Sequence, residues 1–290
     1  MIATNTAILE QGATPIFADI EYDTLNIDHC NVAQKITEKT KAIMCVHYAG
    51  APCKLDELRV IAHSYGIPVI EDAAQALGAK HNGRYIGSTG ELVSFSFQAI
   101  KVITSGDGGA IATEDKELYE KLQTLIWFGI DKKRRERTAL GVLPYDVEVL
   151  GFKYNMNDIA ATLGLVGLNH FDEAIQKRRM IAHRYYDELE NEDITLLKYP
   201  SNIESSYWMF PIHIKHRLQF AEYMRSKDIE VSIHYPRNDK YTIFGGKQSL
   251  PVTEKVDSDI IHIPIHTNLS DQQVTYIIDV VNKWNGYKSL

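Results

Sequence analysis

The sequence predicts an α/β protein, with a mostly parallel sheet that has helices on both faces, followed by a smaller α+β unit. From residue 15 to about residue 129, short runs rich in strand-forming residues alternate with amphipathic stretches of helical spacing. After residue 190, shorter strand-like and helical segments alternate. We therefore expect a large domain over 1–150, a linking helical segment over 151–190 and a small C-terminal domain over 191–290.

The first part of the chain contains five candidate strands. They lie at 16–18, 42–46, 68–70, 92–97 and 110–113. Apolar residues recur at helical spacing from Leu55 to Tyr65, and Gly66 stands where a helix C-cap belongs. This segment is expected to be a crossover helix between parallel strands. Two further helices are expected, one that ends near Gly12 and one over about 116–128.

The second part begins with a break in the periodicity. Glycine, proline and charged residues over 141–151 predict a long loop. Asn157 is a plausible N-cap for a helical stretch that runs, with a possible kink, to about Leu189. Beyond it the pattern predicts a strand at 208–214, a helix at 218–225, a strand at 229–234 and a closing helix at 271–284.

Composition favours a small-molecule partner and a cytoplasmic location. The formal net charge is -7, so no overall positive field attracts nucleic acid. Cys30, Cys45 and Cys53 show no CxxC spacing, so neither a disulfide framework nor a metal site is indicated, and reduced thiols fit best. No apolar run approaches the ~20 residues that a membrane-spanning helix needs.

Asp72 is the first candidate for chemistry. It belongs to the run Glu71–Gln75, which follows the apolar strand candidate at 68–70. Open α/β sheets bind ligands at the carboxyl ends of their strands, so Asp72 would lie at the ligand-binding edge. Its carboxylate can serve a ligand or can cap the N-terminus of a helix, and spacing alone does not separate these alternatives.

Lys101 is the second candidate. It follows the strand at 92–97, in which Ser94 and Ser96 share one face, so a hydroxyl and an amine emerge near the same sheet edge. A partly buried amine has a lowered pKa and can act as a nucleophile, although an ordinary surface lysine is the common alternative. The glycine-rich run 106–109 is expected to be a turn before a strand. It is not the GxGxxG fingerprint, which disfavours a nicotinamide dehydrogenase.

Three blocks resemble, in order and spacing, the DegT/StrS-type sugar aminotransferases. The blocks are 69–75, 95–110 and 151–161, and the resemblance runs from about Ala3 to the C-terminus. Three ordered blocks are much more specific than one. The resemblance implies fold type I of the pyridoxal-phosphate-dependent transferases, with 1–150 as the cofactor-binding domain, and a homodimer with a shared active site.

The resemblance also implies roles for individual residues. Lys101 would hold the aldehyde of pyridoxal 5'-phosphate and act as general acid and base, and Asp72 would pair with the pyridine nitrogen. Gln75 would lie near the ring hydroxyl, and Ser96 would donate to the phosphate. Related dehydratases carry a histidine at the position of Lys101, so the lysine favours amino transfer.

Three further residues are candidates for phosphate or substrate. Lys153 stands where the family commonly has asparagine, in a block that reaches the neighbouring subunit's phosphate site. This departure from the family pattern leaves the contact of Lys153 open. His234 and Arg237 are weaker candidates for the sugar-nucleotide region, and ordinary loop roles are equally compatible with their positions.

The implied reaction is transfer of an amino group, from glutamate as donor, to a keto group of a nucleotide-linked deoxysugar used in surface polysaccharide or a glycosylated metabolite. Family members usually have further residues before this chain's first residue, including a phosphate-binding turn at a helix N-terminus. The alternatives are therefore a fragment of a longer enzyme or a truncated, catalytically inactive homologue that acts as an interaction or oligomerisation module. Cofactor binding separates an active enzyme from an inactive homologue.

Overall fold

The computed structural model describes residues 1–90, 92–134, 137–147, 149–246 and 248–286. Its central sheet has the strand order β1-β2-β5-β6. The strands are β1 (Ile43–Val46), β2 (Val69–Asp72), β5 (Leu92–Ser96) and β6 (Gly109–Ala112). The first three are parallel, and β6 runs antiparallel to β5. The predicted mostly parallel sheet is confirmed.

The crossover helix α3 (Leu55–Ser64) forms as the spacing predicts. Its buried side chains Leu55, Leu58 and Ala62 lie on one face and join the core above the sheet, while Asp56 and Glu57 stabilise its N-terminal turn. Gly66 follows with a φ of 63°, a conformation that glycine adopts without strain. The helix therefore ends where the sequence predicts.

Two predicted strands are not strands. Residues 16–18 are extended but pair with no neighbouring strand among the described residues, and 229–234 forms only an isolated bridge between Ser232 and His262. Apolar, β-branched side chains favour extended backbone locally. A strand also needs a hydrogen-bonding partner, and local sequence does not reveal one.

The predicted long helix is two helices. α5 (Asp158–Leu168) begins at Asn157, whose side chain accepts a hydrogen bond from the Ala160 amide at 2.9 Å. α6 (Phe171–Glu188) follows after a break at Asn169 and His170. The possible kink in the predicted helix thus corresponds to a full interruption.

The C-terminal part has its own antiparallel sheet, of order β10-β9-β7. Its strands are β7 (Ile194–Leu196), β9 (Phe210–Ile214) and β10 (Ile260–Ile263). Its core contains side chains of α6, α7 (Arg217–Arg225) and α9 (Asp271–Asn282). The remaining helices are α1 (Ile2–Glu10), α2 (His29–Lys35), α4 (Lys116–Leu125) and α8 (Pro251–Asp259). A third small sheet holds β3 (Lys80–His81), β4 (Arg84–Tyr85) and β8 (Ile203–Glu204). Short 3-10 helices lie at Tyr48–Gly50, Lys132–Arg134, Asn238–Lys240 and Thr242–Phe244.

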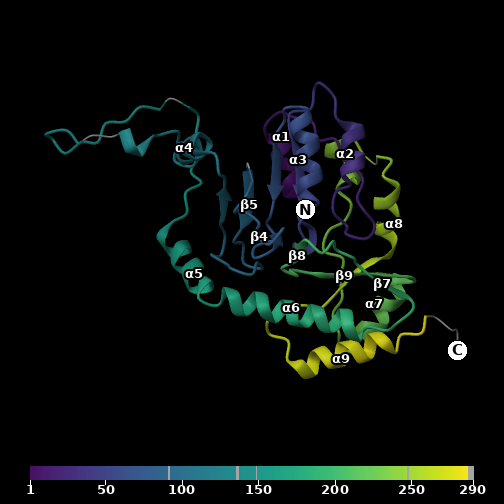
Figure 1. Cartoon of the computed structure of the whole chain (residues 1–290). Helices are drawn as coiled ribbons and strands as arrows, with labels where there is room; N and C mark the ends of the chain where they lie inside the picture. Colours follow the sequence, from purple (N-terminus) through teal and green to yellow (C-terminus); the bar gives the residue numbers. More distant parts are fainter. Residues whose placement is uncertain (91, 135–136, 148, 247, 287–290) are drawn as a thin grey trace.

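Figure 1 shows how these parts are arranged. α5 and α6 run along one side of the central sheet toward the C-terminal unit, where α9 packs against α6. Residues 137–147, between α4 and α5, extend away from the rest of the molecule. None of the described helices is both long and apolar enough to cross a membrane.

Candidate active site

The candidate residues gather at the carboxyl edge of the central sheet. Asp72 ends β2 and lies in register with Val46 of β1, while Ser94 of β5 lies on its other side. Ser96 ends β5, and Lys101 lies in the turn that follows, where its amide donates to the Gln98 carbonyl at 2.9 Å. The parallel strands thus bring a carboxylate, a hydroxyl and an amine to one edge.

Asp72 is half-buried and has a partner for each carboxylate oxygen. Oδ2 accepts a hydrogen bond from the Thr4 hydroxyl at 2.6 Å, and Oδ1 accepts from the Ala74 amide at 3.0 Å. The second bond fixes a turn, because no helix begins directly after β2. The helix N-cap role expected as an alternative for Asp72 is therefore wrong, since the carboxylate orders a turn and not a helix, and its role toward a ligand stays a prediction.

Lys101 is not an ordinary surface lysine. Its side chain is half-buried, and Nζ lies 4.2 Å from the centroid of the Trp208 ring. Burial lowers the pKa of the Lys101 amine, and the negative charge of Asp72 partly opposes this. The amine therefore releases its proton more readily than an exposed lysine does.

Gln75 is buried beside these two residues. Its Oε1 accepts from the Ala49 amide at 2.7 Å, and its own carbonyl accepts from the Ser206 hydroxyl at 3.1 Å. Burial raises the pKa of the nearby Tyr235 phenol, and the Asp72 charge adds to this effect. Gln75 thus links the edge of the sheet to the segment that leads into the C-terminal unit.

Ser96 lies at the same sheet edge as Asp72 and Lys101, whereas Lys153 lies on the segment before α5. The half-buried Ser96 hydroxyl accepts only a long hydrogen bond, 3.3 Å, from the Gln98 amide. Lys153 is exposed on the segment before α5, where Nζ donates to Asn155 at 2.6 Å and lies 4.6 Å from the Trp127 ring centroid. None of the interactions found among the described residues joins Lys153 to Asp72 or Lys101.

His234 and Arg237 differ in their freedom to meet a substrate. His234 is exposed and stacks on His262, with 4.9 Å between the ring centroids. Arg237 is buried, and its guanidinium donates to both oxygens of Asp239, at 2.9 and 2.6 Å. His234 is therefore accessible, whereas Arg237 is already engaged in an ion pair.

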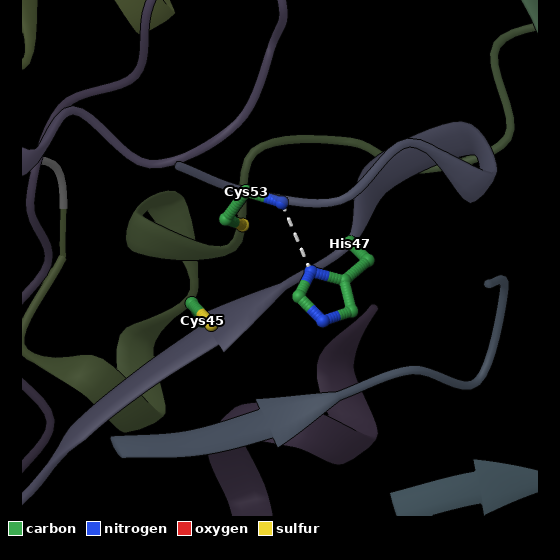
Figure 2. Close-up of side chains that lie close together, drawn as sticks. All are labelled: Cys45, His47 and Cys53. Atoms are coloured by element: carbon green, nitrogen blue, oxygen red, sulfur yellow. Dashed lines mark hydrogen bonds between the residues drawn. The ribbon is translucent and has the colours of Figure 1, made fainter. Parts of the chain in front are cut away.

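A second polar cluster lies beneath the sheet edge (Figure 2). Ligand atoms of Cys45, His47 and Cys53 all lie within 4.8 Å of one another, and the three side chains are buried. His47 Nδ1 accepts from the Cys53 amide at 3.1 Å, and Nε2 lies 3.0 Å from Glu71. Both ring nitrogens are thus engaged, so no free lone pair remains for a metal ion. This geometry favours a hydrogen-bonded network over a metal site.

Sequence reasoning missed two neighbours of the candidate residues. Thr4 meets Asp72 from a helix 68 positions away, and no local pattern marks that contact. Trp208 lies against Lys101 from the segment before β9. The pattern over 208–214 predicts a strand, although an aromatic face that borders a lysine is also a cation-binding surface.

The chain is similar to curated sugar-modifying enzymes over nearly its full length. It is 34% identical to the GDP-perosamine synthase of Escherichia coli O157:H7, over 99% of this chain and 77% of that protein. It is also 34% identical to the dTDP-3-amino-3,6-dideoxy-alpha-D-galactopyranose transaminase of Aneurinibacillus thermoaerophilus, again over 99% of this chain and 77% of that protein.

Solved structures agree with these similarities. The sugar aminotransferase CalS13 from Micromonospora echinospora superposes with a TM-score of 0.92 at 29% identity, over 98% of this chain and 78% of that one. The PLP-form of the putative sugar aminotransferase Spr1654 from Streptococcus pneumoniae gives a TM-score of 0.86 at 28% identity, over 97% and 78% of the two chains.

The pattern of the DegT/DnrJ/EryC1/StrS aminotransferase family matches residues 1–282. This match and the structural similarities confirm the expected fold, the enzyme class and the expected cofactor, pyridoxal phosphate. The chain therefore belongs to the DegT/DnrJ/EryC1/StrS family of pyridoxal-phosphate-dependent sugar aminotransferases.

Proposed function

We propose that this protein transfers an amino group from glutamate to a keto group of a nucleotide-linked deoxysugar, with Lys101 as the catalytic residue. The observation that carries the proposal is the convergence of the half-buried Lys101 amine and the Asp72 carboxylate at the carboxyl edge of the sheet. Two relatives whose names describe a GDP-linked and a dTDP-linked amino sugar support a nucleotide-sugar substrate.

The side chains at this edge fit pyridoxal phosphate by their chemistry. Lys101 provides an amine for the aldehyde, and Asp72 provides a carboxylate for the pyridine nitrogen. Gln75 and Ser96 supply an amide and a hydroxyl for the ring hydroxyl and the phosphate. When bound, the cofactor supplies a ring that withdraws electrons from the substrate carbon.

Proton transfer is the task proposed for Lys101 itself. Its pKa is lowered by burial, so Nζ is more often unprotonated at neutral pH than the nitrogen of an exposed lysine and can accept a proton from a substrate carbon. Lys101 Nζ can then donate that proton to an atom next to the one from which it came. The Asp72 carboxylate would pair with the ring nitrogen, and the Thr4 hydroxyl orients that carboxylate.

A second copy of the chain is part of the proposal. α5 is almost entirely apolar, yet none of its residues is buried, and Ile159 is 78% exposed. The preceding segment adds exposed apolar side chains, including Leu150 and Tyr154. Contiguous exposed apolar surface of this kind typically marks an interface. A homodimer would cover it, and Lys153, on the same segment, would reach the partner's phosphate site.

The first experiment measures the visible absorption of the purified chain mixed with pyridoxal phosphate. We expect a yellow band that requires Lys101, is absent in Lys101→Ala and bleaches when glutamate is added. Lys39→Ala, which removes an exposed lysine, is the matched control and should keep the band. If no band forms at any cofactor concentration, the chain is not an aminotransferase as it stands, and the inactive interaction module becomes the better interpretation.

The second experiment tests the dimer. Light scattering after size-exclusion chromatography should give twice the chain mass of 32.9 kDa. Leu163→Glu places a charge on the apolar surface of α5 and should produce a monomer. Leu218→Glu, at an exposed leucine of α7, should leave the mass unchanged. A wild-type monomer at micromolar concentration would contradict the shared site.

A further inference from the structure

We propose that Trp208 is a positioning residue that holds the Lys101 amine against its ring face and favours the protonated amine. The inference rests on the proposed function of Lys101 and adds a residue that acts on it. Trp208 belongs to the segment between β8 and β9, so its contact with Lys101 links the C-terminal unit to the turn that carries the lysine.

The geometry of the contact is specific. Nζ of Lys101 lies 4.2 Å from the centroid of the Trp208 ring, within the ~6 Å reach of a cation–π interaction. The Trp208 indole also donates from Nε1 to the Ile100 carbonyl at 3.4 Å. The ring therefore touches both the amine and the backbone next to it, and its 8% exposure excludes most water from the contact.

The backbone that carries Trp208 is fixed in place. Tyr207 has a φ of 48°, a left-handed conformation that costs a non-glycine residue energy. The Trp208 carbonyl accepts from Arg178 at 3.1 Å, and the Ser206 amide donates to the Gly50 carbonyl at 3.0 Å. The strained residue Tyr207 is thus held by hydrogen bonds at the residues before and after it. Such strain is typical of sites where the direction of a neighbouring side chain, here that of Trp208, has a function.

The Trp208 ring stabilises the ammonium form of Lys101, which burial destabilises. Burial disfavours the ammonium form, and among the described residues the groups that face Nζ are the Asp72 carboxylate and the Trp208 ring. The Asp72 carboxylate favours the ammonium form of Lys101. The face of the Trp208 ring attracts the ammonium group, as a second carboxylate would, but carries no charge of its own. Lys101 can therefore keep a proton after accepting it.

Fluorinated tryptophan tests the attraction without changing the shape of the site. The chain has three tryptophans, so Trp127→Phe with Trp284→Phe leaves Trp208 as the only one to be labelled. Each fluorine weakens the negative potential of the ring face. The pKa of Lys101 is read, without cofactor, from the pH dependence of acetylation at that residue by peptide mass spectrometry. Lys80, which lies near the unlabelled ring of Tyr85, is the internal control.

We expect the Lys101 pKa to fall stepwise with fluorination, by roughly 0.4 to 1.5 units in total, while that of Lys80 stays constant. An unchanged Lys101 pKa across the series overturns the proposal. If the doubly substituted background does not fold, Trp208→Phe and Trp208→Leu in the otherwise intact chain give the same comparison, with phenylalanine retaining most of the effect. Equal pKa values in these two variants would also overturn it.

The fluorination experiment can fail or succeed independently of the proposed aminotransferase function. The Lys101 pKa is measured without cofactor, so a fluorine-dependent shift stands even where no yellow band forms. A normal band with a fluorine-independent pKa would instead support the aminotransferase and remove Trp208 from its machinery.

Discussion

Replacement of Glu71 by glutamine tests the buried polar network beneath the sheet edge. Glu71 is 1% exposed, with Oε2 at 3.0 Å from His47 Nε2 and Oε1 at 2.9 Å from an Arg59 nitrogen. Glutamine has the same shape but only one acceptor oxygen. Because His47 Nδ1 already accepts from the Cys53 amide, Nε2 must donate, and the glutamine oxygen has to stay with His47. The glutamine nitrogen then faces Arg59, so two donors oppose each other.

The expected cost follows from burial and charge. Because His47 Nδ1 accepts from the Cys53 amide and Nε2 donates to Glu71, the imidazole ring is neutral. The ion pair that the substitution breaks is therefore Glu71–Arg59. Removal of one partner from a buried ion pair costs about 3–5 kcal/mol. Arg59 is 34% exposed and can turn toward water, which reduces the loss. We expect the free energy of unfolding to fall by about 2–3 kcal/mol.

Urea unfolding at pH 7, followed by circular dichroism, measures this change. Glu38→Gln, at an exposed glutamate, is the matched control and should change the free energy of unfolding by less than about 0.5 kcal/mol. Glu71→Gln should also retain the Lys101-dependent band at saturating cofactor, because it leaves Asp72 in place. A loss below about 1 kcal/mol, with an unchanged urea slope, would refute a stabilising buried network in which Glu71 pairs with Arg59 and accepts from His47.

Three other substitutions have defined outcomes. Asp19→Asn should lower the free energy of unfolding in urea by about 2 kcal/mol, because the buried Asp19 carboxylate accepts from the amide and hydroxyl of Thr253 at 2.8 and 2.6 Å. Gly129→Ala should lower the melting temperature, since its new Cβ would clash with the Val149 carbonyl oxygen; an unchanged melting temperature would contradict that close approach. Burial lowers the pKa of His262 to about 4, whereas the unfolded chain takes up the proton near ~6.5. The free energy of unfolding should therefore fall by about 3 kcal/mol from pH 6.5 to 4, and His262→Gln should remove most of that slope.

The parallel part of the fold could be predicted because its signals are local. β1, β2 and β5 are short apolar runs, and α3 has one apolar face. Once the strands are parallel, their carboxyl ends share one edge, so the proximity of Asp72, Ser96 and Lys101 follows from the order of the elements.

The remaining features depend on partners that lie far away in the chain. The Trp208 indole bonds to Ile100 across 108 positions, and among the described residues the segment at 229–234 has only a bridge to His262. Neither the helix α8 nor the strand β10 was predicted, because their charged and apolar residues over 251–263 show no clean period. The division into domains at residues 150 and 190 stays a proposal.

The pair α5 and α6 has a consequence for how such a protein can change during evolution. α6, with 18 residues, is a rigid rod of about 27 Å whose far end contributes Ile181 and Tyr185 to the C-terminal core. α5, joined to it through only Asn169 and His170, carries the exposed apolar surface. An insertion or deletion at Asn169 and His170 would therefore turn the exposed apolar surface of α5 relative to the helix α6 that supports the small unit. New partners are more easily acquired by exchanging side chains on α5 than by inserting or deleting residues at this joint.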